Sequence, residues 1–351
     1  MNCESRDEGA ITDNMIEYLT SSDFLVMMIK VIVIFGGVMG ALAYLTWLER
    51  KVMARVQMRP GPTRVGPFGL LQPLADGLKF LFKEDVIPTN ANRFLYIAAP
   101  LVSLIPAMLA FSVIPFGPWL QVTDLSVGLL FVFAITSLGV YGIALGGWAS
   151  NSKYPLMGAM RSSAQMISYE LSLTLSIVGV LLIANTLSLR QLVTSQQSTW
   201  LGFIPRWNIF LQPVAFLVYV VSAIAETNRL PFDLAESEQE LVAGWHTEYS
   251  SLKFAMFMLA EYANMVTVSA LATIMFLGGW SGPLFGPNWL QAALPTVWFV
   301  LKIFVFIFFY VLLRSTIPRF RYDQLMKFGW KVLLPLSLAN ILVTSFIVAI
   351  S

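Results

Sequence analysis

Residues 225–249 read AETNRLPFDLAESEQELVAGWHTEY and separate two long apolar segments. The stretch holds a run of acids against one arginine and one histidine: Glu226, Asp233, Glu236, Glu238, Glu240 and Glu248. A connection between two helices commonly needs only a few residues. We therefore expect this long acidic connection either to form a binding surface or to handle protons, with a plain solvated loop as the alternative.

The rest of the chain has the composition of a membrane protein. Of its 351 residues, 57% are hydrophobic and 12% charged, and the mean hydropathy is +0.72, which excludes a soluble two-domain protein. Cys3 and His246 are the single cysteine and the single histidine. They are too few to hold an iron–sulfur cluster or a bis-histidine haem, and no dinucleotide-binding fingerprint follows a predicted strand. We expect any redox centre to lie on partner chains.

Eight apolar runs, each of about twenty residues, predict eight transmembrane helices. The runs are Phe24–Trp47, Leu95–Ile114, Leu125–Trp148, Ser162–Asn185, Ile209–Ala225, Leu252–Leu277, Leu290–Leu313 and Val332–Ile350. Residues 1–23 form an acidic extension that lacks the basic head of a signal peptide, so we expect the first span to be retained. The predicted fold class is an all-α polytopic membrane protein, with residues 24–351 as one transmembrane domain.

The distribution of Lys and Arg predicts the orientation of these spans. The loops 48–94, 149–161, 226–251 and 314–331, together with Lys253 beside the third loop, hold 17 of the 22 basic residues. The other loops hold only Arg6, Arg190 and Arg206. Because basic loops stay on the inside, both termini are expected outside and the acidic stretch inside, in the cytoplasm.

The first inside loop is predicted to be structured. Residues 59–69 read RPGPTRVGPFG, and the prolines and glycines indicate a rigid, turn-rich segment from which Arg59 and Arg64 project. Leucines then recur at helical spacing through residues 70–82, opposite Asp76 and other polar residues. This pattern predicts a short amphipathic helix in the membrane interface, either as a plain anchor or as one wall of a cavity that opens to the bilayer.

Two acids fall inside predicted spans. Glu170 and Glu261 lie about 12 Å and about 14 Å from the inner ends of their spans, near the middle of the bilayer. A carboxylate at that depth is expected to face the bundle interior or a hydrated cavity, where desolvation favours the neutral form and suits it to proton exchange. The plain alternative is a neutral glutamate hydrogen-bonded to Gln165, Ser168 or Tyr262.

Several motifs resemble one known family. They are WLERK at 47–51, RPGPTRVGPFGLLQPLAD at 59–76, IPFGP at 114–118, QMISYE at 165–170 and AETNRLPFDLAE at 225–236. Together they resemble the H-subunit family of NADH:quinone oxidoreductase, respiratory complex I, whose member in mitochondria is called subunit 1. The resemblance extends from about Phe24 to the last span, and Thr63 departs from a commoner asparagine in the second motif.

The resemblance implies the roles of individual residues. In that family the membrane subunit crosses the bilayer eight times, forms the membrane side of the quinone chamber and begins the proton path. By position, the quinone-chamber residues are Glu49, Arg50, Arg59, Arg64, Asp76, Arg229 and Phe232. The proton-path residues are Glu170, Glu226, Asp233, Glu236, Glu240, Glu248 and Glu261.

The resemblance also implies the partners. The substrate would be a quinone, either ubiquinone or menaquinone, and this chain would hold no catalytic residue of its own, metal, flavin or haem. FMN and iron–sulfur clusters would lie on partner subunits, with the peripheral-arm quinone-site and iron–sulfur subunits docked on the inside face. Small membrane subunits, antiporter-like subunits and lipid would lie laterally, in a bacterial inner membrane, and no nucleic acid is expected.

Two other functions are alternatives. A proton-coupled secondary transporter usually shows internal repeats, and the two halves of this sequence show none. The membrane anchor of an energy-converting hydrogenase or another ferredoxin-linked complex uses a similar scaffold. The quinone-chamber motifs favour complex I over this second alternative.

Overall fold

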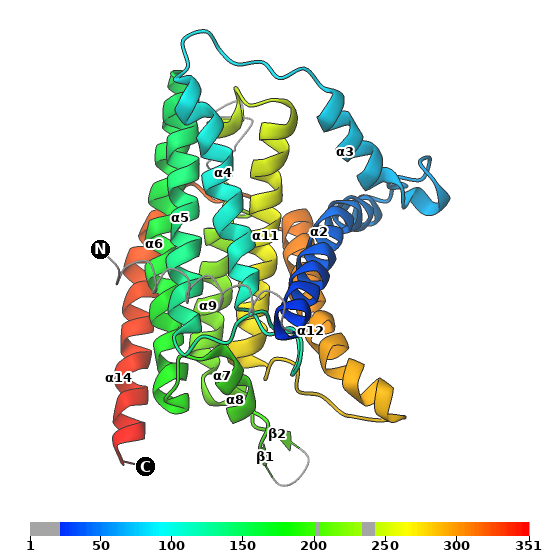
Figure 1. Ribbon diagram of the computed structural model, residues 1–351. Helices are drawn as coiled ribbons and strands as arrows, with labels where there is room; N and C mark the ends of the chain where they lie inside the picture. The colour runs from blue at the N-terminus through cyan, green and yellow to red at the C-terminus, as the bar shows by residue number, and fades with distance from the viewer. Residues whose placement is uncertain (1–21, 201–203, 234–242, 351) are drawn as a thin grey trace, which may run out of the picture.

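The computed structural model describes residues 22–200, 204–233 and 243–350, and its architecture is helical (Figure 1). Within these residues, seven helical segments are long and apolar enough to cross a membrane. They are α2 (Ser22–Val56), α4 (Arg93–Leu109) with the 3-10 turn η2 (Ala110–Ser112), α5 (Gly128–Ala149), α6 (Lys153–Ala184), α11 (Ser251–Phe276), α12 (Asn288–Thr316), and a last segment over Tyr322–Ile350. The chain is therefore an all-α polytopic membrane protein.

The segment expected as the fifth span is divided. It forms α8 (Asn208–Leu211) and α9 (Pro213–Glu226), and α9 has only 14 residues. The backbone leaves the helical region at Gln212, with φ −132° and ψ 57°. Pro213 has no N–H to continue the ladder from α8, so α9 begins there as a new helix.

Several helices are longer than the apolar runs that predicted them. Helix α2 continues nine residues beyond Trp47, and α6 begins nine residues before Ser162. Glu49 therefore belongs to a helix instead of a loop, and Glu170 lies about 26 Å from the first residue of its helix. The last segment consists of α13 (Tyr322–Phe328), a π turn η4 (Gly329–Leu333) and α14 (Leu334–Ile350). A helix does not need apolar residues to continue, so its ends extend past the bilayer.

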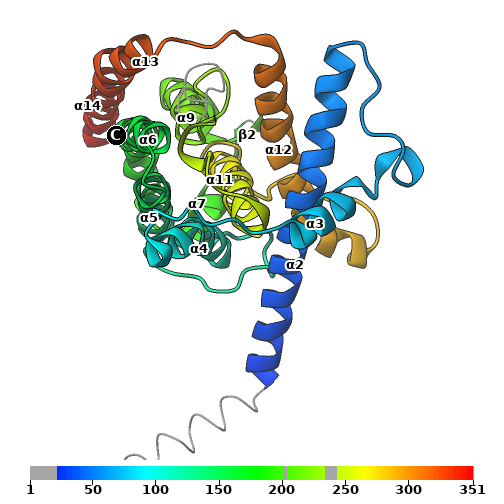
Figure 2. The same cartoon turned by 90° about the horizontal axis from the view of Figure 1, so that it is seen from above.

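The helices pack in two groups about a centre, as Figure 2 shows. Helices α4, α5, α6 and α14 lie on one side, α2 and α12 on the other, and α9 and α11 between them. The closest packing joins α4 and α5, where Gly142 faces Ser103 and a Cβ at Gly142 would lie 2.0 Å from the Ser103 hydroxyl oxygen. Small residues at such contacts let membrane helices approach.

Three connections between helices contain local structure: the one after α2, the one between α6 and α8, and the end of the acidic stretch. After α2, the 3-10 turn η1 (Pro67–Gly69) leads to α3 (Gln72–Phe82), which lies at the edge of the bundle against α2 and α11 and has no buried residue. Its apolar side chains are exposed, Leu74 by 63% and Phe82 by 86%. Between α6 and α8 lie α7 (Leu189–Ser195) and a pair of antiparallel two-residue strands, β1 (Thr199–Trp200) and β2 (Ile204–Pro205). The sequence did not predict this second connection.

The end of the acidic stretch is docked on the bundle. Its 3-10 turn η3 (Gly244–His246) packs so closely on α6 that a Cβ at Gly158 would lie 2.7 Å from the Trp245 nitrogen. Tyr249 stacks on Tyr96 of α4 with ring centroids 4.2 Å apart, and the Tyr96 hydroxyl donates to the Glu248 carbonyl at 2.6 Å. Glu236, Glu238 and Glu240 lie outside the described residues.

Candidate functional site

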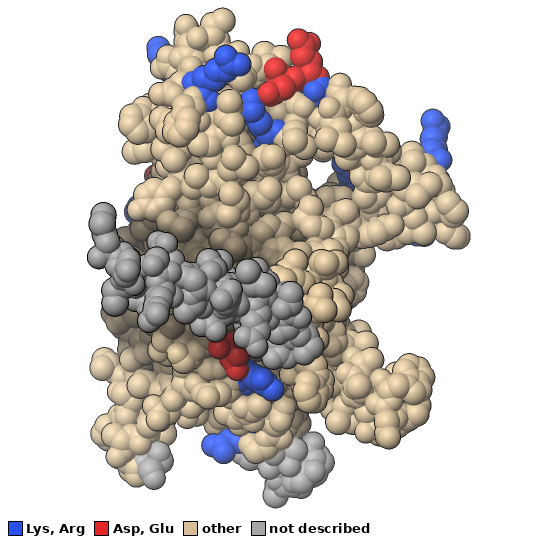
Figure 3. Space-filling model, viewed as in Figure 1, with Lys and Arg blue, Asp and Glu red and all other residues tan. Residues whose placement is uncertain are grey.

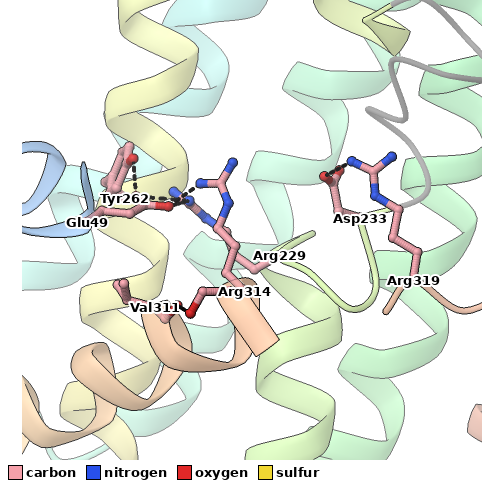
Figure 4. Close-up of polar contacts among 8 residues, drawn as sticks. Glu49, Arg229, Asp233, Tyr262, Val311, Arg314 and Arg319 are labelled. Atoms are coloured by element: carbon pink, nitrogen blue, oxygen red, sulfur yellow. Dashed lines mark hydrogen bonds and ion pairs between the residues drawn. The ribbon is translucent and has the colours of Figure 1, made fainter. Parts of the chain in front are cut away.

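A buried charge cluster joins four parts of the chain (Figure 4). The carboxylate of Glu49 in α2 is 3% exposed and lies 3.1 Å from Nη1 of Arg229, which follows α9. Arg314, in the last turn of α12, forms a second ion pair with the same carboxylate, and the Tyr262 hydroxyl of α11 donates to it. Elements far apart in the sequence thus meet at one acid. We call these four residues the Glu49 cluster.

A tight turn aims Arg229 into the bundle. Asn228 adopts a left-handed backbone, φ 49°, a conformation that asparagine tolerates better than most residues. The turn closes where the Phe232 N–H donates to the Arg229 carbonyl at 2.8 Å. Gln165 of α6 clamps the turn because its amide donates to the carbonyls of Ala225 and Phe232, at 2.8 and 2.9 Å. The QMISYE and AETNRLPFDLAE motifs therefore meet in space.

The Glu49 cluster carries one negative charge and two positive charges. Within the described residues, Nε and Nη2 of Arg229 are buried and have no hydrogen-bond partner. The guanidinium lies over the Tyr262 ring, 4.3 Å from its centroid, which offsets part of the cost of burying it. A cavity of about 10 Å³ beside Glu49, Arg229, Tyr310 and Arg314 has room for about one water. The cluster thus retains donors for a further acceptor.

Asp233 and Arg319 form a second pair beside the Glu49 cluster (Figure 4). Nη2 of Arg319 lies 3.2 Å from one carboxylate oxygen of Asp233, and the other oxygen is buried with no hydrogen-bond partner among the described residues. Burial raises the pKa of Asp233 to about 6, the charge of Glu261 adds to that rise, and Arg319 opposes it. Glu261 also acts on Arg229 and so links the two groups electrostatically.

Glu226 and Glu170 form a second pair of acids. Glu226 is the last residue of α9, and one of its carboxylate oxygens is buried with no hydrogen-bond partner in the described parts of the chain. Glu170, from the middle of α6, is near enough for the two charges to interact. The Ser137 hydroxyl of α5 donates to Glu170. That partner differs from the three side chains considered from the sequence, because α5 packs against the face of α6 that carries this acid.

The remaining quinone-chamber residues are spread over several surfaces. Phe232 is buried between Tyr169 and Phe320, with ring centroids 6.1 and 5.5 Å away, on an apolar cavity of about 850 Å³ between α9, α12 and α13. Arg50 and Asp76 join α2 to α3 through an ion pair of 2.8 Å. Arg59 and Arg64 are exposed, and the Arg59 Nε donates to the Gln57 side chain at 2.7 Å.

Of the predicted proton-path residues, the structure brings four into electrostatic contact: Glu170 with Glu226, and Glu261 with Asp233. Glu248 is half-buried where η3 meets α4 and lies within reach of Tyr96. Glu236 and Glu240 fall outside the described residues. These four acids therefore form two pairs, and Glu261 also acts on Arg229 of the Glu49 cluster.

The sequence profile of the NADH dehydrogenase family matches residues 29–345. The chain belongs to this family. Among curated relatives, the NADH-quinone oxidoreductase H subunit 2 of Koribacter versatilis is 56% identical over 349 residues, covering 93% of this chain and 98% of that protein. The H subunit 1 of Solibacter usitatus is 48% identical over 398 residues (94% and 98%), and the H subunit of Thermomicrobium roseum is 52% identical over 327 residues (90% and 94%).

The sequence missed three residues of this candidate site. Arg314 and Arg319 counted only as basic residues of an inside loop, and Tyr262 only as a partner for other glutamates. One signal was present: Glu49 sits in a helix that continues an apolar span, and a buried acid needs a buried cation. The sequence could not say which of the neighbouring arginines supplies it. Among the described residues, no group of three or more His, Cys, Asp and Glu side chains is placed to hold a metal.

Proposed function

We propose that the chain is a membrane subunit of a proton-translocating NADH-quinone oxidoreductase, respiratory complex I. In this proposal it forms the membrane side of the quinone chamber and the acidic start of the proton path. The observation that supports it best is the Glu49 cluster, in which two arginines share one buried carboxylate and Arg229 keeps two buried donors without a partner in the described residues.

The Glu49 cluster suits the chemistry of quinone reduction. Electrons that reach a quinone place negative charge on its oxygens, and prearranged cationic donors stabilise charge as it develops. The excess positive charge of Arg229 and Arg314 over Glu49 supplies such a field, and Glu49 and Arg229 are both buried. Arg50, Arg59, Arg64, Asp76 and Phe232 complete the proposed chamber and its mouth.

The row of acids suits proton transfer away from that chamber. Asp233 and Glu261 lie next to the Glu49 cluster, and Glu226 and Glu170 continue into the bundle. A change of charge at the cluster changes the proton affinity of each acid in turn, because groups in a low-dielectric interior interact strongly. We include Glu236, Glu240 and Glu248 in the same path.

The proposed topology has eight spans. Helices α8 and α9 together cover residues 208–226, about 28 Å of helix, which nearly matches a hydrocarbon core of about 30 Å. Residues 24–351 form one transmembrane domain and residues 1–23 an outside extension. The loops 48–94, 149–161, 226–251 and 314–331 face the cytoplasm of a bacterial cell, and the exposed leucines of α3 enter the membrane interface as an amphipathic helix.

The proposed partners follow from this topology. Soluble peripheral-arm subunits would dock on the inside face and bring FMN and iron–sulfur clusters, and this chain would add no metal, flavin or haem. Small membrane and antiporter-like subunits would pack laterally in the lipid. The substrate is a quinone, ubiquinone or menaquinone. None of the three relatives named above is a transporter or a hydrogenase component, so neither alternative is favoured.

Replacing Arg229 by Gln tests the proposal in membranes that contain the assembled complex. We expect NADH:quinone activity to fall at least about tenfold, the cost of one charged donor, while reduction of an artificial acceptor by the peripheral arm is unchanged. Arg229→Lys should restore part of the activity because it restores the charge. Arg206→Gln, on the exposed hairpin, is the control. Wild-type quinone kinetics in Arg229→Gln would remove the cluster from the chamber.

A further inference from the structure

A charged cavity lies beside the N-terminal part of α2. Its volume is about 330 Å³, and its lining consists of Lys30 of α2, Arg190 of α7, and Pro118, Trp119, Gln121, Val122 and Asp124 of the loop before α5. Most basic residues lie toward the other end of the bundle, and Figure 3 shows charged side chains gathered mainly at the upper end of the face in view. Two cations in one small cavity at the charge-poor end therefore call for an explanation.

The charges in this cavity are incompletely paired. Nη1 of Arg190 lies 4.0 Å from Asp124, and the same carboxyl accepts from the Ser188 hydroxyl at 3.2 Å. Within the described residues, Lys30 has no ion pair or hydrogen bond, although its side chain is half-buried. The cavity thus holds one acid against two cations, and one of those cations is available to an anion.

An apolar cavity of about 500 Å³ lies further along the same face of α2. It begins at Val33, one turn of α2 beyond Lys30, and ends at Leu48, about 22 Å further along the helix. Phe116 and Leu120 line its near end and belong to the same loop that lines the charged cavity. Helix α12 forms the opposite wall. One half of a hydrocarbon core is about 15 Å thick, so an acyl chain from this end fits within the groove.

We propose that the two cavities form one site for an anionic phospholipid. Lys30 and Arg190 bind the phosphate, and an acyl chain lies in the groove between α2 and α12. Trp119, with 79% of its surface exposed, sits beside the charged cavity, where a tryptophan suits the boundary between headgroup and hydrocarbon. This inference goes beyond the proposed function and uses its topology only to name the leaflet, which is the outer one.

The test uses the intact complex, washed with detergent and analysed for retained phospholipid by mass spectrometry. A second measurement gives the affinity of the complex for phosphatidylglycerol in nanodiscs. In the double variant Lys30→Gln/Arg190→Gln this affinity should fall about thirtyfold, the effect of losing two basic residues at a headgroup. Arg206→Gln removes another cation from the same end of the bundle, and this variant should retain the lipid. Inorganic phosphate at buffer concentration should not displace it, because free phosphate gains nothing from the groove.

A second pair of variants fills the groove without touching the charges. Gly37 lines the apolar cavity and Gly40 does not, and a Cβ added at either meets nothing within 4 Å among the described residues. Gly37→Leu should lower lipid retention, and Gly40→Leu should leave it unchanged. The proposal is overturned if both charge and groove variants retain wild-type lipid. It is also overturned if a helix from a partner chain fills the groove in the complex.

Discussion

Arg229 and Glu49 are 180 residues apart in the chain, yet Nη1 of one lies 3.1 Å from Oε1 of the other inside the bundle. The ion pair joins the turn after α9 to the inner end of α2, so the acidic stretch is bonded to the helix that leads into the first inside loop. Arg314 adds α12 to the same carboxylate. A displacement of any one element therefore changes the charge balance at the other two.

Removing the shared acid should destabilise the site more than removing a surface charge. Glu49→Gln leaves Arg229 and Arg314 facing each other without an anion, and breaking a buried pair costs about 3–5 kcal/mol. Glu49→Gln/Arg229→Gln should recover part of that loss, because one unpaired cation is gone. The temperature at which the complex is inactivated by heat measures the loss of stability in the single and in the double variant. Arg50→Gln, which breaks the more exposed pair with Asp76, should cost under about 1 kcal/mol, and an equal loss in the two single variants would contradict the buried-pair argument.

Neutral replacement of the inner acids should separate proton transfer from folding. Glu170→Gln and Glu226→Gln keep the side-chain volume but cannot release a proton, so we expect assembled complexes whose quinone reduction and coupled proton transport both fall. Membrane vesicles that report pH gradients measure the second quantity. Ser137→Ala, which removes only the donor to Glu170, is the matched control and should have a smaller effect. Normal pumping in both glutamine variants would exclude these acids from the path.

Asp233 should give the stability of the complex a specific pH dependence. Burial raises its pKa from 3.8 to about 6, so the folded protein binds this proton more tightly than the unfolded chain does. The resulting stabilisation is present below about pH 4 and is lost as pH rises through about 6, with a size of roughly 3 kcal/mol. Asp233→Asn should flatten that part of the profile of inactivation temperature against pH. Arg319→Gln removes the opposing charge, so it should shift the transition to higher pH.

The first inside loop should affect quinone access more than electron transfer. Asp76→Leu breaks the link from α2 to α3, and Arg59→Ala removes a projecting cation, so each should raise the apparent KM for quinone. Reduction of an artificial acceptor by the peripheral arm should not change. Lys79→Ala, on the same helix but outside the predicted chamber, is the control. If all three variants show wild-type quinone kinetics, α3 is a surface anchor only.

The apolar runs alone placed most of the helices, because burial in lipid requires long uninterrupted hydrophobic segments whatever the neighbours are. The motifs alone identified the family. The same sequence placed the helix ends wrongly by up to ten residues. Hydrophobicity marks the part of a helix that lies in the bilayer, whereas the backbone hydrogen bonds of the helix continue beyond it. They continue through Glu49 in α2 and through residues 153–161 in α6. The break at Gln212 was not predicted, because the apolar run continues through it.

The tertiary structure decided which charges meet. From the sequence, Glu49, Arg229 and Arg314 were three charges at the ends of different spans, and nothing in their spacing paired them. The packing of α2, α11 and α12 around the turn after α9 brings them together and buries Glu49 and Arg229, so the pairing of those two charges is energetically decisive. The sequence by itself determined a polytopic membrane protein with acids gathered next to one end of its spans. Only the fold decided that one carboxylate serves two arginines, because that choice depends on side chains that the chain brings together from 265 residues apart.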